Sequence, residues 1–105
     1  RKILGICGYR VLFRVYHFFP MENAIRNYIG SICLWASAPE GERKSVATRC
    51  MSHYFAEMTR YHGVDWVLVV DASFEARKAM GEGLNCIDAT EMAFRRLRRG
   101  ASDTA

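Results

Sequence analysis

The stretch ERKSVATRCMSHYFAEMTRY, residues 42–61, carries the strongest structural signal in the chain. Its apolar side chains recur every three or four residues, the spacing that places them on one face of an α-helix. Gly63 follows as a residue type that commonly ends a helix. We therefore predict an amphipathic helix over residues 42–61 that needs a partner helix. Its apolar face consists of Val46, Ala47, Cys50, Met51, Tyr54, Phe55, Met58 and Tyr61.

A matching partner precedes this stretch. After Pro20, which suits the first turn of a helix, residues 21–37 repeat the same apolar spacing. The connecting segment SAPEG, residues 37–41, is short enough to make the two helices antiparallel neighbours. We therefore predict a helical hairpin of residues 21–37 and 42–61. Its central contacts should bring Tyr54 and Phe55 against Ile25, Tyr28, Ile29 or Ile32.

Two further helices are predicted towards the ends of the chain. Residues 2–19 are apolar around most of a helix circumference, so this helix should pack on two sides. The last helix is expected over about residues 88–99, with Asn85 or Asp88 as its amino-terminal cap and Gly100 as its carboxyl-terminal cap. Residues 101–105 then form a tail.

The segment VDWVLVV, residues 64–70, fits two structures. Its β-branched residues favour a strand, but the chain has no second strand-like run to pair with it. We therefore favour a helix that continues to Met80 and ends at the break Gly81-Glu82-Gly83. The alternative is a strand that pairs with another chain, which would make the fold α+β.

Length and composition indicate one domain. The chain has 105 residues, half of them hydrophobic, and a formal net charge of +4. The fold class expected is all-α, a small bundle of three to five helices around the hairpin, with residues 1–100 as a single helical domain. No apolar run is long and uncharged enough to predict a membrane-spanning helix.

Several apolar residues have no obvious place in one small bundle. Leu34 and Trp35 lie off the apolar stripe of residues 21–37, and Trp66 and Val69 lie in a segment that is apolar on nearly every side. Exposed apolar area of this extent marks an interface in most proteins. We expect Leu34, Trp35, Trp66 and Val69 to contact another polypeptide or lipid.

The last predicted helix carries the densest positive charge. Arg95, Arg96 and Arg99 share one side of it, whereas Arg98 lies apart. Guanidinium groups bind phosphates and carboxylates well, so an anionic lipid, RNA or an acidic subunit is the expected partner of the three. Basic residues also suit the carboxyl end of a helix for purely structural reasons.

Neither catalysis nor a bound cofactor is predicted. Cys50 and His53 are three residues apart and could begin a zinc site with Cys86 or His62, but tetrahedral sites usually use two such close-spaced pairs and this chain has only one. No glycine-flanked nucleophile or phosphate-binding loop is recognisable. We therefore expect no enzyme activity, no cofactor and no metal. We also expect the four cysteines to be reduced core residues, which favours a reducing intracellular compartment.

Leu12-Phe13-Arg14, in the first predicted helix, resembles the motif of the LYR family of mitochondrial assembly factors and respiratory-complex subunits. Members of that family are three-helix bundles that bind acyl carrier protein. The resemblance covers three residues, has Phe in place of Tyr, and is followed within a few residues by Pro20. It implies an assembly factor or an accessory subunit of a respiratory complex.

The function expected from the sequence is therefore that of a non-catalytic helical subunit or adaptor of a larger assembly, acting through protein–protein contacts. A basic nucleic-acid-binding domain that uses the arginine cluster is the first alternative, and a LYR-like accessory subunit is the second. The basic chain starts at Arg1 rather than Met, from which we expect a processed or excised chain and a mitochondrial location.

Overall fold

The computed structural model describes residues 20–104, with side chains described for residues 20–99. This part of the chain contains helices and turns but no strand, which confirms the predicted all-α class. The predicted helix over residues 2–19 and the LYR-like tripeptide lie outside the described residues. The four helices are α2 (Pro20–Ser37), α3 (Glu42–Met58), α4 (Trp66–Gly81) and α5 (Cys86–Thr104).

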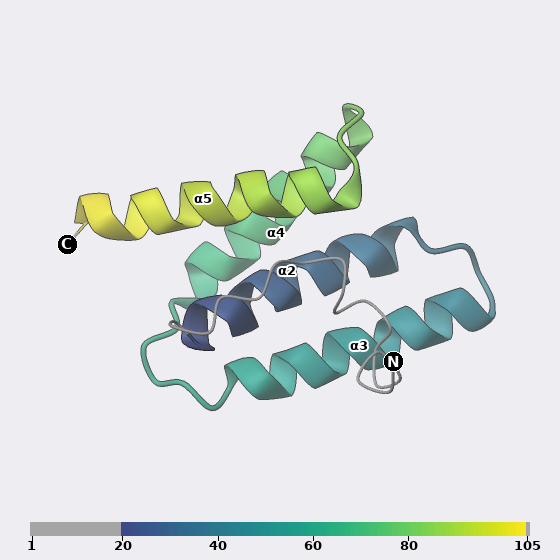
Figure 1. The fold of residues 1–105 in the computed structure, drawn as a ribbon, viewed down its shortest axis with the longest axis horizontal. Helices are drawn as coiled ribbons and strands as arrows, with labels where there is room; N and C mark the ends of the chain where they lie inside the picture. Colours follow the sequence, from purple (N-terminus) through teal and green to yellow (C-terminus); the bar gives the residue numbers. More distant parts are fainter. Residues whose placement is uncertain (1–19, 105) are drawn as a thin grey trace.

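Helix α2 lies at the centre of this arrangement (Figure 1). It packs against α3 on one side and against α4 and α5 on the other, and α4 and α5 also pack closely on each other. The α2–α3 pair is the predicted antiparallel hairpin. Because α2 contacts three helices, it is apolar around more of its circumference than a surface helix would be.

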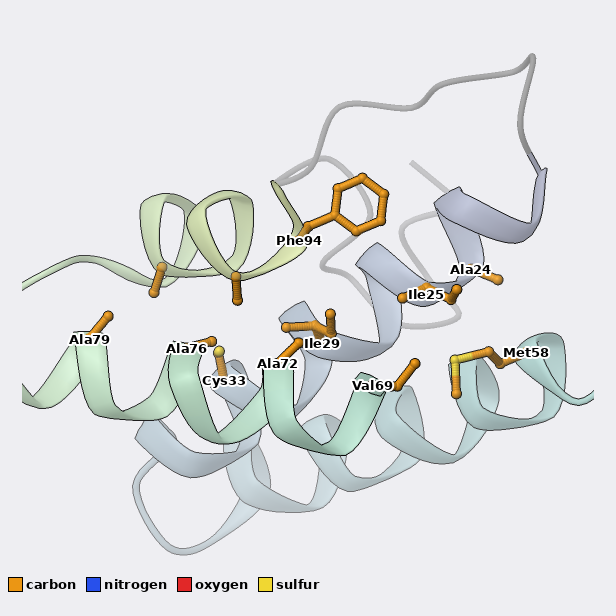
Figure 2. Close-up of a cluster of buried hydrophobic side chains, with 12 residues drawn as sticks. Ala24, Ile25, Ile29, Cys33, Met58, Val69, Ala72, Ala76, Ala79 and Phe94 are labelled. Carbon is orange, nitrogen blue, oxygen red and sulfur yellow. The ribbon is translucent and has the colours of Figure 1, made fainter. Parts of the chain in front are cut away.

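The main core lies where α2, α4 and α5 meet (Figure 2). Alanines dominate the contribution of α4 and α5, so these two helices approach closely without leaving gaps between side chains. Larger side chains from α2 and α3 fill the remaining space, chiefly Ile29 and Met58, both fully buried. The alanines are Ala72, Ala76 and Ala79 of α4 with Ala89 and Ala93 of α5.

Side-chain caps begin the two later helices. The Asp65 carboxylate accepts a hydrogen bond from the Leu68 backbone N–H at 3.2 Å, which caps α4. The Asn85 carbonyl Oδ1 accepts one from the Asp88 N–H at 2.8 Å, so Asn85 rather than Asp88 caps α5. Gly83 has a φ of +115°, a conformation that residues with a side chain rarely adopt. The predicted break at residues 81–83 is confirmed.

Three predicted boundaries are wrong. Helix α3 ends at Met58 rather than Tyr61, because the chain tightens there into turns in which Arg60 and Tyr61 donate to the carbonyls three residues back. Helix α5 begins at Cys86 and continues through Gly100 to Thr104, so Gly100 does not end it and residues 101–104 are helical rather than a tail. One glycine costs a helix only about 1 kcal/mol, which the residues around it can offset.

The predicted hairpin contact is confirmed for both aromatic residues, but only Tyr54 is a core residue. Tyr54 is buried and shares a cluster with Tyr28. The Phe55 ring lies 6.0 Å from that of Tyr28, between ring centroids, yet 46% of Phe55 is exposed, so its predicted burial is wrong. Adjacent helical residues point about 100° apart, so only one of the two can point into the core.

Candidate interaction surface

Helix α4 presents apolar side chains to solvent as well as to the core. Val67 is 69% exposed and Phe74 is 61% exposed, and Val70 between them is also exposed. They are separated by three and four residues and therefore line one face of the helix. The opposite face of α4 is built into the core through Val69, Ala72, Ala76 and Ala79.

Two aromatic residues extend this exposed stripe towards α3. Trp66, the first residue of α4, is more than one-third exposed, and its ring centroid lies 5.3 Å from that of Phe55. Trp66 is one helical turn before Val70, so the aromatic pair continues the stripe. We call the five exposed residues the α4 apolar face: Phe55, Trp66, Val67, Val70 and Phe74.

A hollow of about 570 Å³ lies beside Phe74, where the carboxyl ends of α2 and α4 come together. Arg77 and Lys78 contribute charged side chains to its wall, and Ala36 contributes a small apolar one. Such a hollow next to an exposed phenylalanine can receive a side chain from another molecule. Asp71 and Glu75, both exposed on α4, add negative charges along the same helix.

The partner-binding residues predicted from the sequence fall in different places. Trp66 belongs to the α4 apolar face, but Val69 is 1% exposed and is a core residue, so it is not available to a partner. Leu34 and Trp35 are half-buried. Lys44 of α3 covers Trp35: its Nζ lies 4.6 Å from the ring centroid and donates to the Trp35 carbonyl oxygen at 2.6 Å.

The sequence prediction did not include three residues of this surface, although their spacing places them on one face of the helix. Val67, Val70 and Phe74 repeat at intervals of three and four within the predicted helix. The same helix carries a second apolar stripe through Val69, and the sequence gives no reason to choose which stripe faces the core.

The arginines of α5 do not act as one cluster. Arg96 forms an ion pair with Glu75 of α4, with 2.7 Å between Nη1 and Oε1. Arg98 pairs with Glu22 of α2, with 3.3 Å between Nε and Oε2. Arg95 and Arg99 are exposed. Of the three residues predicted to meet an anionic partner, one therefore already contacts a carboxylate of the same chain.

Arg26 of α2 is a buried charge that the sequence did not reveal. Its Nε lies 3.2 Å from Oε2 of Glu91 on α5, and its guanidinium lies 4.6 Å from the centroid of the Phe94 ring. The contact is an ion pair between opposite charges. The pair joins α2 to α5 inside the bundle.

Cys33 and Cys86 are free thiols that contact each other across α2 and α5. Cys33 is fully buried and Cys86 is half-buried. The Cys86 side chain lowers the pKa of the neighbouring Cys33 thiol, and the same interaction raises the pKa of the Cys86 thiol. Cys50 is disulfide-bonded, so the expectation that all four cysteines are reduced is wrong for this residue.

Among residues 20–99, no group of three or more His, Cys, Asp or Glu side chains is arranged to hold a metal ion. None of the helices in the described part of the chain is long and apolar enough to cross a membrane. Comparison with protein families, curated proteins and solved structures found no match to this chain.

Proposed function

We propose that this protein is a non-catalytic helical subunit or adaptor, and that it binds another polypeptide through the α4 apolar face. One observation carries the proposal: α4 exposes Val67, Val70 and Phe74 although its opposite face already builds the core. A helix that only had to cover the core would carry polar residues on its outer face.

The arrangement of the face favours a helical partner. Intervals of three and four residues are those at which one helix contacts another along a seam. Phenylalanine and tryptophan are enriched at the centres of protein interfaces, and charged residues are enriched at their rims. Here Asp71, Glu75, Arg77 and Lys78 lie on the same helix as the apolar residues and supply such a rim.

Site-specific photocrosslinking in the native host tests the proposal. A photoreactive p-benzoylphenylalanine in place of Val70 should give an adduct with another polypeptide, identified by mass spectrometry, including a second copy of this chain if that is the partner. The matched control carries the same group in place of Ser52, an exposed residue of α3. The double variant Val67→Gln/Phe74→Gln should abolish the adduct. Equal adducts from both positions, or none from position 70, would contradict the proposal.

The nucleic-acid alternative rests on the exposed Arg95 and Arg99. Replacing Arg95, Arg96 and Arg99 by Gln separates it from the first proposal. If the partner is RNA or DNA, the substitutions should weaken binding strongly at low salt and little at high salt, because phosphate contacts are screened by salt. If the partner is a polypeptide held by the α4 apolar face, the adduct from position 70 should persist in the triple variant.

A further inference from the structure

We propose that Cys33 and Cys86 are a redox-active pair that forms a reversible disulfide between α2 and α5, with a small disulfide such as glutathione disulfide as the oxidant. The inference concerns the bundle interior and does not depend on what the α4 apolar face binds.

The fold places the two sulfurs together. Cys33 lies in α2 and is fully buried, and Cys86 is the first residue of α5. The Cys86 Sγ donates to the Gly30 carbonyl oxygen at 3.8 Å, and Gly30 is one turn before Cys33 on the same helix. Cys86 therefore lies over the turn of α2 that carries Cys33, and it packs against the core cluster to which Cys33 belongs.

The surroundings of the pair favour the thiolate form of Cys33. The neighbouring Cys86 side chain lowers the pKa of Cys33, and the positive charge of Arg77 acts in the same direction. The same interaction with Cys33, together with burial, raises the pKa of Cys86. The pair thus holds one proton between its two sulfurs once the first proton has left. Thiolates, not thiols, exchange with disulfides.

Exposure assigns the order of the two steps. The half-buried Cys86 meets the oxidant first, and the neighbouring Cys33 thiolate acts as the base that takes up the proton of Cys86. Its thiolate attacks one sulfur of glutathione disulfide, the oxidant's S–S bond breaks, and one glutathione leaves. Cys33 then gives its proton to solvent and attacks the Cys86 sulfur, and the second glutathione leaves.

The electrons and protons balance. The two protein sulfurs lose two electrons in forming one S–S bond, and glutathione disulfide takes them up in becoming two thiolates. Each leaving thiolate is protonated from solvent. Starting from the singly deprotonated pair, the whole reaction consumes one proton.

The disulfide would fix the position of α5 relative to α2. Helices α3 and α4 lie between Cys33 and Cys86 in the sequence, so the bond closes a long loop that contains both. Closing a long loop restricts the unfolded chain and raises stability. The oxidised protein should therefore unfold at a temperature higher by at least about 5 °C than the reduced protein.

The test uses the full chain in buffers of graded glutathione to glutathione disulfide ratio, quenched with a thiol alkylating agent. Peptide mapping should show Cys33 joined to Cys86, and this linked peptide is the readout because the disulfide of Cys50 can change the intact mass in the same buffers. The change should reverse when glutathione is added back. Cys86→Ser should remove both the linked peptide and the rise in unfolding temperature, with the helical circular dichroism spectrum retained.

Three outcomes would overturn the proposal: both thiols alkylated at every ratio, glutathione attached to Cys86 with no internal bond, or Cys50 as the partner of either residue. Cys33→Ala is a second variant, because it tests the same bond from the buried side. In this variant glutathione should remain attached to Cys86, since the attacking sulfur is gone; the absence of such an adduct would remove the assigned order of steps.

Discussion

Arg26 and Glu91 form a buried ion pair, and we predict that replacing one residue lowers the free energy of unfolding far more than replacing the other. The Arg26 side chain is 4% exposed and the Glu91 side chain is 23% exposed. Glu91→Gln therefore removes a carboxylate from beside a positive charge that stays inside the bundle. Arg26→Met leaves a carboxylate that water can already reach, and the methionine fills most of the space.

The magnitudes follow from that difference. Removing one partner of a buried pair costs about 3–5 kcal/mol when the other charge stays buried. Asn23, whose Oδ1 lies 3.5 Å from Nη1 of Arg26, and the Phe94 ring still stabilise the guanidinium in Glu91→Gln. We therefore expect the lower end of the range, about 3 kcal/mol. For Arg26→Met we expect about 1 kcal/mol or less, since apolar replacements of buried ion pairs are often neutral.

Urea unfolding followed by far-ultraviolet circular dichroism measures both values. With an m-value of about 1.5 kcal/mol per molar urea, 3 kcal/mol lowers the midpoint by about 2 M. The double variant Arg26→Met/Glu91→Gln should be more stable than Glu91→Gln alone, because the buried charge has gone. The reasoning is refuted if Arg26→Met costs more than Glu91→Gln, or if the losses of the two single variants simply add.

Other predictions concern single side chains. Tyr54→Ala should cost about 3–5 kcal/mol of unfolding free energy and Phe55→Ala only about 1 kcal/mol, since Phe55 is largely exposed; similar losses would mean that Phe55 is covered by protein. Asp65→Ala should cost about 1 kcal/mol by removing the cap of α4, whereas Asp65→Asn should restore most of it. Gly83→Ala should destabilise by about 1 kcal/mol or more, because alanine is strained at a φ of +115°. The control Gly81→Ala, at a position with open space and in the last residue of α4, should be neutral or stabilising in the same thermal melt.

The sequence by itself predicted α2, α3, α5 and the first hairpin, and it favoured a helix over a strand for α4. The apolar spacing of residues 21–37 and 42–61 and the short SAPEG connection are local features, and they predict α2, α3 and their antiparallel contact. Asn85 and the glycines at 81 and 83 likewise mark a break and a new helix through local hydrogen bonding and backbone freedom. The end of α3 at Met58 was not predicted, because helix ends depend on turns that many sequences can form.

The tertiary structure alone decided which side of each helix faces inward and which distant residues meet. Helix α4 has apolar residues on two faces, so only its packing on α2 and α5 assigns Val69 to the core and Val67 to the surface. Cys33 lies near Cys86 because the first turn of α5 packs on the turn of α2 that carries Cys33. These contacts join residues far apart in the chain, and they depend on the relative placement of whole helices, which no local pattern of side chains encodes.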